Sequence, residues 1–279
     1  MDAPGKIVKV NDTHMHVYNM PAPSPKRKDT IVFLAGSGTE CPTYDFKPLW
    51  QLLLGRYSMV VVERPGYGWS GQTENPRDID TVLEETREAL QQAGIEGPFI
   101  PAAHSLSGLE ALYWAQKYPG EVSAIIGLDM AVPKVYDTMK IPKSVTWSVR
   151  LGNLFRRPIA SIMMKGHPAV RNNMLDADEQ AAMRHIIAKQ FMSKNMRDEI
   201  YCVKENARKV EEGGRPSVPV LCCLSNDKEL LKKIPAWEKL HRNYFSSNKR
   251  VKYARLSCGH YLHRDAPDEV DKAITNFLK

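Results

Sequence analysis

Apolar residues in this chain are gathered into short continuous runs. A run without a polar residue at every second position is typical of a strand that is buried on both faces of a parallel sheet. Runs of this kind occupy residues 30–35, 58–63, 98–103, 122–129 and 218–224. Helical periodicity alternates with the first four runs, over residues 46–55, 78–93 and 109–118. This alternation predicts an α/β fold with a mostly parallel central sheet flanked by helices.

Both ends of the chain add to the predicted sheet. Residues 6–10 and 13–18 alternate around the turn-forming pair Asn-Asp, which predicts an N-terminal β-hairpin. The C-terminal part predicts a last strand at 250–256 between helices at 236–245 and 267–278.

The alternation stops after residue 132. Up to about residue 212 only helical patterns occur, at 144–155, 158–165, 177–192 and 196–210. The charge also changes there: residues 133–217 hold 16 lysines and arginines against 9 aspartates and glutamates, whereas the remainder holds 23 of each. We therefore predict a core made of residues 1–132 and 216–279, with residues 133–215 inserted as a separate helical unit.

The junction between strand 98–103 and helix 109–118 carries the first candidate for chemistry. It reads Ala-His-Ser-Leu-Ser-Gly over residues 103–108, with small residues two positions before and two positions after Ser105. Small neighbours are needed where a sharp strand-to-helix turn projects a nucleophilic serine out of the sheet. Ser107 is a second candidate, but its own frame has a leucine where a small residue is needed. Ser105 is therefore the better candidate.

A serine hydroxyl needs a base that accepts its proton and a carboxylate that orients the base. His260 follows the last predicted strand directly after a glycine, which lets the loop return toward Ser105. We predict His260 as the base, and we interpret His263 as a supporting or surface residue. For the carboxylate, Asp227 after strand 218–224 is our choice. Asp129, which also ends a strand, is the alternative.

Two backbone amides would complete the site. An oxyanion hole needs the amide of the residue after the nucleophile, here Leu106, and a second donor from the loop after an earlier strand. Ser37 lies between two glycines after strand 30–35, and the glycines let the backbone approach closely. We predict the amides of Ser37 and Leu106 as the oxyanion donors.

These segments together resemble the α/β-hydrolase fold over nearly the whole chain. The matching segments are residues 33–38, 63–70, 104–108, 128–129, 226–227 and 259–260. The chain departs from the usual family pattern at Ala35, where histidine is common, and at Glu63, where aspartate is common. The resemblance implies that residues 133–215 form a helical cap over the site. The serine at position 105 disfavours haloalkane dehalogenases and epoxide hydrolases, because those relatives use aspartate there.

Composition limits the remaining choices. No apolar run approaches the length of a membrane-spanning helix, and the first residues lack the apolar stretch of a signal peptide, so we expect a cytoplasmic protein unless a leader or anchor has been removed. The five cysteines are odd in number and scattered, which favours free thiols and matches no zinc pattern. We expect neither a metal nor an organic cofactor, and no nucleic-acid partner. The oligomeric state stays open.

The predicted cap holds seven of the twelve methionines, which suit an adaptable apolar pocket or ordinary helix packing. Its surplus of positive charge, and a basic amphipathic helix at 144–155, leave open a weak contact with a membrane surface.

The predicted function is a serine hydrolase that cleaves an ester, or a related acyl bond, of a small apolar substrate through an acyl-enzyme. One alternative is an aminopeptidase of the proline iminopeptidase type, which would need a carboxylate to hold a free amine; Glu205, Asp198, Glu199 and Glu110 are available. The other is a ligand-binding protein that keeps the fold without turnover.

Overall fold

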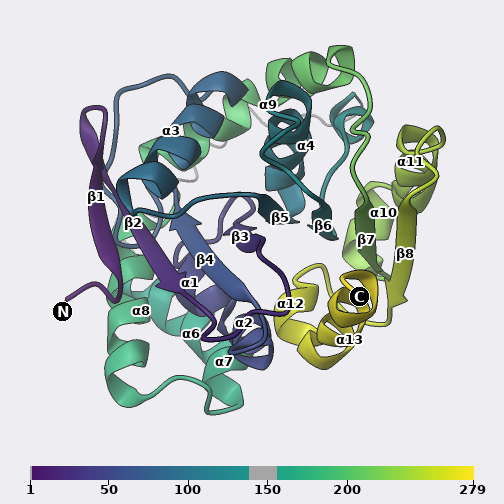
Figure 1. The fold of residues 1–279 in the computed structure, drawn as a ribbon. Coiled ribbons are helices and arrows are strands. Elements are labelled where there is room, and N and C mark those ends of the chain that lie inside the picture. The colour runs from purple at the N-terminus through teal and green to yellow at the C-terminus, as the bar shows by residue number, and fades with distance from the viewer. Residues whose placement is uncertain (1, 138–155) are drawn as a thin grey trace.

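A computed structural model describes residues 2–137 and 156–279, and these form an eight-stranded sheet with helices on both faces (Figure 1). The strands are β1 (Lys6–Val10), β2 (Thr13–Met20), β3 (Thr30–Leu34), β4 (Ser58–Glu63), β5 (Phe99–His104), β6 (Ile125–Leu128), β7 (Val220–Ser225) and β8 (Val251–Leu256). Their order across the sheet is β1-β2-β4-β3-β5-β6-β7-β8. The pairings β1–β2 and β2–β4 are antiparallel and the others are parallel. The predicted α/β class is confirmed.

Two layers of helices cover the sheet. On one face, α3 (Ile79–Gln92), α4 (Gly108–Lys117), α9 (Lys194–Glu212) and α11 (Trp237–Tyr244) share an apolar core with the strands. On the other face lie α2 (Lys47–Leu53), α12 (Leu262–Asp265) and α13 (Pro267–Phe277). Figure 1 shows α3, α4 and α9 above the sheet and α2, α12 and α13 below it. The sequence predicted one helix over residues 46–55, where the structure has α2 preceded by the short α1 (Pro42–Asp45).

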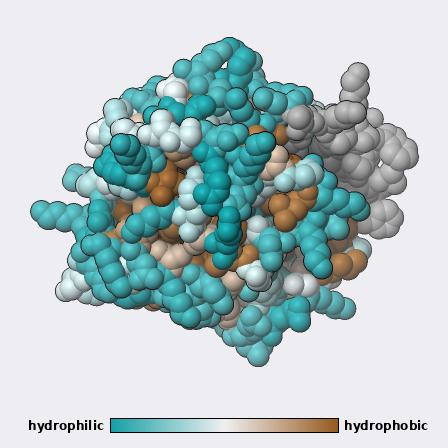
Figure 2. Space-filling view, turned by 90° about the vertical axis from the view of Figure 1, so that its right-hand side faces the viewer, coloured by the Kyte–Doolittle hydropathy of each residue, from teal (hydrophilic) through white to brown (hydrophobic). Residues whose placement is uncertain are grey.

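The central strands are apolar because both of their faces are covered. Every residue of β3, β5, β6 and β7 is buried, as expected for continuous apolar runs. The edge strand β8 instead alternates half-buried with exposed positions, and Lys252 and Arg255 are exposed. Figure 2, which looks at the side of the molecule where β8 lies, shows a mainly hydrophilic surface with separate apolar spots. Charged side chains of this kind protect a sheet edge from pairing with another chain.

The segment between β6 and β7 contains helices and no strand in its described part. After the short turn η2 (Pro133–Tyr136) come α6 (Arg156–Gly166), α7 (Pro168–Arg171), α8 (Ala177–Gln190) and α9. The basic helix expected at 144–155 lies outside the described residues.

The helices of this segment pack in two places. Helices α6, α7 and α8 build an apolar cluster with Cys41 and Tyr44, whereas α9 packs against α4 and η2 (Figure 1). The division into a core and a separate cap at residues 133–215 stays a prediction.

Candidate active site

Ser105 stands at a strained turn between β5 and α4. Its φ of 51° is in the left-handed region, which a serine seldom occupies, and such strain is typical of functional turns. The turn is tight on the side of Gly108 as well, since a Cβ there would come within 2.4 Å of the Ala131 carbonyl oxygen. The Ala131 amide donates to the Ser105 carbonyl over 2.7 Å and holds the turn against the segment after β6.

Ser107, the competing serine, has a structural position. It is fully buried, and its hydroxyl lies 2.7 Å from the Leu34 carbonyl oxygen and 2.8 Å from the His104 carbonyl oxygen. It therefore ties the turn to β3 from a position without contact to solvent. Ser105 is partly exposed and has a histidine as its partner.

His260 lies between Ser105 and a carboxylate. Its Nε2 atom is 2.9 Å from Ser105 Oγ, and its Nδ1 atom is 2.8 Å from Asp129 Oδ2. The His260 side chain is 23% exposed, whereas the Asp129 side chain is fully buried. The loop after β8 thus brings the predicted base to the predicted nucleophile.

The expectation that Asp227 contacts the His260 ring is wrong. Asp227 is the N-cap of α10 (Lys228–Lys233), a helix that the sequence reading missed: its Oδ1 accepts from the Leu230 amide over 2.7 Å. Its Oδ2 accepts from the backbone amide of His260, 3.2 Å away, and not from the ring. These amide hydrogen bonds lower the pKa of the Asp227 carboxyl. Asp227 thereby fixes the backbone that carries His260.

Asp129, the alternative, occupies the place beside the ring. It follows β6 with φ 50°, and β6 and β7 are neighbours in the sheet. Besides His260, its carboxylate accepts hydrogen bonds from the Ser225 amide (3.1 Å), the Ser225 hydroxyl (2.6 Å) and the Trp237 indole N–H (2.8 Å). These donors hold one orientation of a buried carboxylate.

The loop after β3 passes close to Ser105. A Cβ added to Gly36 would come within 2.8 Å of Ser105 Cβ, so only glycine lets the backbone approach this closely. Ser37 follows in a turn, and Leu106 is the residue directly after Ser105 in the short 3-10 turn Ser105–Ser107. The two predicted oxyanion donors are therefore carried by segments adjacent to the nucleophile, and their role stays a prediction.

A buried cluster around Asp45 lies near His260 and includes His263, three residues further along the chain. His263 Nε2 is 2.6 Å and His167 Nε2 is 3.1 Å from its carboxylate, and Arg264 Nη1 donates to it over 2.9 Å. Although burial opposes ionisation, Arg264 and His263 hold the pKa of Asp45 well below its usual range. Because His167 belongs to the segment 133–215, the cluster fastens that segment to α12, and it gives His263 a buried supporting position.

A second buried network involves the carboxylates considered for amine binding. Arg64 makes two hydrogen bonds to Glu199, of 3.0 and 3.1 Å, and one of 3.3 Å to Glu110. Tyr67 donates to Glu199 over 2.7 Å. Glu205 lies at the surface and pairs with Arg208. Glu199 and Glu110 therefore already have a cationic partner. Burial of this network is not visible in the sequence.

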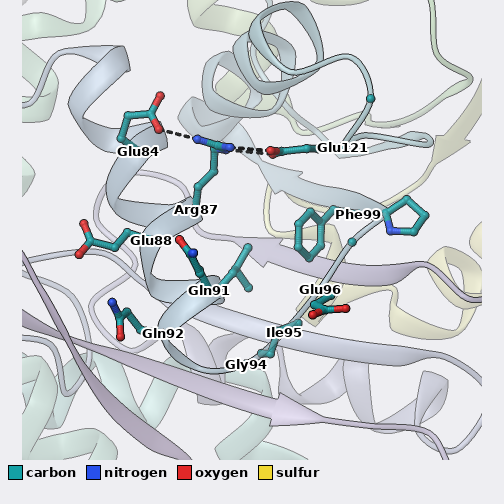
Figure 3. Close-up of a pocket in the computed structure, with 14 residues that line it drawn as sticks. Glu84, Arg87, Glu88, Gln91, Gln92, Gly94, Ile95, Glu96, Phe99 and Glu121 are labelled. Carbon is teal, nitrogen blue, oxygen red and sulfur yellow. Dashed lines mark hydrogen bonds and ion pairs between the residues drawn. The ribbon is translucent and has the colours of Figure 1, made fainter.

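Two cavities differ in their relation to Ser105. The larger, about 930 Å³, lies beside the start of β5, at the opposite end of the strand from Ser105 (Figure 3). Figure 3 shows Arg87 in this cavity between Glu84 and Glu121, so this arginine is already paired with two carboxylates. The smaller, about 440 Å³, lies between residues 38–45, helices α6 to α8, and residues 261–265.

Two chain segments that line the smaller cavity continue to the residues that contact or include the Ser105–His260 pair. Gly38 lines it two residues after the glycine that touches Ser105, and Tyr261 lines it directly after His260. Cys41, Met163, Met183 and Ile187 supply apolar side chains. In the described residues, no group of three or more histidine, cysteine, aspartate or glutamate side chains is arranged to hold a metal ion. No described helix is long and apolar enough to cross a membrane.

The fold and this site define a class of protein. A model described as "Alpha/beta hydrolase family" matches residues 31–273, and the chain belongs to that family. Among curated proteins, the uncharacterized protein YbdG of Bacillus subtilis (strain 168) is 32% identical over 283 residues, which cover 99% of this chain and 86% of YbdG. The bifunctional esterase/perhydrolase DCH of Acinetobacter calcoaceticus is 28% identical over 109 residues, covering 39% of each chain.

Solved structures agree with this fold. Cfl2 from Burkholderia cenocepacia superposes with a TM-score of 0.75 at 17% identity, covering 98% of this chain and 95% of Cfl2. At this identity the likeness concerns the fold alone.

Proposed function

We propose that this protein is a serine hydrolase that cleaves an ester, or a related acyl bond, of a small apolar substrate through an acyl-enzyme. The observation that carries the proposal is the position of His260, with Nε2 2.9 Å from Ser105 Oγ and Nδ1 2.8 Å from Asp129 Oδ2. Nucleophile, base and orienting carboxylate are then in hydrogen-bond contact in the order that acyl transfer requires. The esterase in the name of the relative DCH is in keeping with this chemistry.

In the proposed reaction, His260 Nε2 takes the proton of Ser105 as Oγ attacks the acyl carbon. Asp129 keeps the Nδ1 proton of the ring in place and stabilises the cation that forms. The leaving alcohol takes the proton from Nε2 as the acyl-enzyme forms. Water then attacks the acyl carbon with His260 Nε2 as its base, and Nε2 gives that proton to Ser105 Oγ as the bond to the acyl group breaks and the acid product leaves.

The negative charge that develops on the acyl oxygen needs donors that are in place before the reaction. We propose the amides of Leu106 and Ser37 for this role, one on each side of Ser105. Both segments are fixed: the Ser107 hydroxyl binds the Leu34 carbonyl, and Gly36 packs against Ser105.

The cavity of about 440 Å³ is the proposed binding place for the apolar part of the substrate. Two methionines of the segment 133–215, Met163 and Met183, line it. Flexible side chains of this type accept substrates of different shape.

Of the two alternatives, the aminopeptidase is disfavoured. A free amine would have to displace Arg64 from Glu199 or Glu110, which are buried in ion pairs with it. Glu205 is bound to Arg208 on the surface. The non-catalytic ligand-binding alternative is tested directly below.

The test is labelling with a fluorophosphonate, which reacts only with an activated serine. The expected result is one label per chain, absent in Ser105→Ala and retained in Ser107→Ala, together with turnover of p-nitrophenyl esters of graded chain length. Absence of labelling in a folded wild-type protein would refute the enzyme and favour a ligand-binding protein.

A further inference from the structure

Glu40 is a buried acid in the wall of the cavity beside the active site. It lies in the loop after β3, two residues beyond Gly38, and only 5% of it is exposed. The Gly68 amide donates to its backbone carbonyl over 2.7 Å, which fixes the loop at this point. The backbone that carries the Glu40 side chain is therefore held at a defined place in the wall of the cavity.

The Glu40 carboxyl has no partner side chain among the described residues. Its only hydrogen bond there is to its own backbone amide. The nearby Arg264 is bound to Asp45, and Arg64 is bound to Glu199 and Glu110. Other buried acids of this chain, such as Glu63 and Glu85, have a basic partner. Glu40 is thus a buried acid without a basic partner.

A buried carboxyl without a cation favours its neutral form, because burial penalises the charge. Burial first, and the nearby charge of Asp45, raise the pKa of Glu40 to about 7, while Arg264 opposes them. In the neutral form the carboxyl carries an O–H donor. Among the described residues no side chain accepts a hydrogen bond from this O–H group. The group is therefore available to a molecule that binds in the cavity.

We propose that protonated Glu40 donates a hydrogen bond to an acceptor oxygen, such as a ketone carbonyl, on the acyl chain of the substrate, and that it selects acyl groups carrying such an oxygen. This inference rests on the proposed function, since it assigns the acyl chain to the cavity of about 440 Å³. It makes Glu40 a specificity residue of that site.

Other titratable groups share the cavity and belong to the pH argument. They come from three regions, around α1, α7 and α12: Cys41 and Asp45, the N-cap and the last residue of α1; His167 and Arg171, the N-cap and the last residue of α7; and Tyr261, Arg264 and Asp265. A ratio of two substrates removes every effect that acts equally on both, so the ratio is the quantity to measure.

The experiment compares keto esters with plain esters of the same length: p-nitrophenyl acetoacetate, levulinate and δ-ketocaproate against butyrate, valerate and caproate. The ratio of kcat/KM within each pair is measured from about pH 5 to about pH 8. For the best-placed ketone we expect a preference of roughly fivefold, the effect of one hydrogen bond, that disappears above neutral pH as Glu40 ionises.

Two variants separate the proposed role from a structural one. Glu40→Gln keeps a donor that does not ionise, so its preference should persist over the whole pH range. Glu40→Leu removes the donor and should abolish the preference at every pH. Glu269→Gln, the same change at an exposed acid outside this cavity, is the matched control and should follow the pH profile of the wild type.

Several outcomes would overturn the inference. Ratios near one for all three pairs, in a wild-type enzyme that is active and labelled at Ser105, would overturn the role of Glu40 and leave the proposed function standing. A preference for p-nitrophenyl ε-aminocaproate over caproate that Glu40→Gln abolishes would show that the carboxylate binds an amine. Absence of both labelling and turnover would overturn the two proposals together.

Discussion

Replacing Asp129 by asparagine should nearly abolish turnover, whereas the same change at Asp227 should not. The buried Asp129 carboxylate accepts from His260 Nδ1 over 2.8 Å and is held by Ser225 and Trp237. An asparagine amide can present an N–H to the ring, which favours the tautomer with the proton on Nε2 and prevents that atom from accepting the serine proton. The corresponding change in a serine protease lowers kcat by about 10⁴-fold, or about 5.5 kcal/mol.

Asp227→Asn should lower kcat much less than Asp129→Asn. Asparagine caps a helix about as well as aspartate, so the hydrogen bond from the Leu230 amide to the start of α10 should survive. The hydrogen bond from the His260 amide, 3.2 Å long, loses its charge, a change of about 1 kcal/mol. We therefore expect kcat to fall by less than about tenfold.

The assay is kcat on one p-nitrophenyl ester, with the rate of fluorophosphonate labelling as a second measure. Thermal unfolding of each variant is the control, because Asp129 also holds Ser225 and Trp237. A variant that is folded at the assay temperature gives a valid rate. The reasoning is refuted if Asp227→Asn loses activity as severely as predicted for Asp129→Asn while Asp129→Asn stays within about tenfold of the wild type.

Three further predictions concern stability. Ser107→Ala should lower the free energy of unfolding, measured by denaturant titration, by about 1 kcal/mol, because the hydroxyl loses its hydrogen bond to the Leu34 carbonyl. An unchanged free energy of unfolding would show that this hydroxyl does not stabilise the fold. Arg64→Met should cost about 3–5 kcal/mol, because Glu110 stays buried without its cation and Glu199 keeps only Arg77, 3.7 Å away. A loss typical of surface changes would contradict this, and Lys209→Met is an exposed control. The Glu40 carboxyl has a pKa of 4.5 in the unfolded chain and about 7 in the folded one, so the free energy of unfolding of the wild type should fall as pH rises through this range. Glu40→Gln has no such group. Its free energy of unfolding relative to that of the wild type should therefore increase between pH 4.5 and about 7, by about 3 kcal/mol in all. A difference between the two proteins that does not change with pH would show that Glu40 does not titrate abnormally.

The sequence predicted the sheet well because its signal is local. Continuous apolar runs mark strands that are buried on both faces, and β4 occupies the predicted residues 58–63. The strand-turn-helix around Ser105 was also readable, since the small residues that permit the turn are adjacent to it in the chain.

The error over the acid arose because both candidates follow neighbouring parallel strands, so position along the chain does not separate them. One local signal was available: the run Lys-Glu-Leu-Leu-Lys-Lys after Asp227 forms helices readily, and an aspartate before such a run is a common N-cap. A carboxylate that caps a helix is directed at backbone amides and cannot also orient the ring. The contacts that favour Asp129 were not readable, because Trp237 lies 108 residues away.

Burial of charge was the other feature that the sequence concealed. Charged residues are usually exposed, so nothing in the residue types alone distinguishes Glu199, which binds Arg64 in the interior, from Glu205, which pairs at the surface six residues later. The sequence likewise does not show that Glu40 is buried without a basic side chain bound to it. A carboxyl keeps its proton near neutral pH only when the fold buries it and places no cation beside it. Both conditions depend on segments that are remote in the chain. In this protein the proposed nucleophile could be found from its neighbours in sequence, whereas the group that we propose to select the substrate required the assembled cavity.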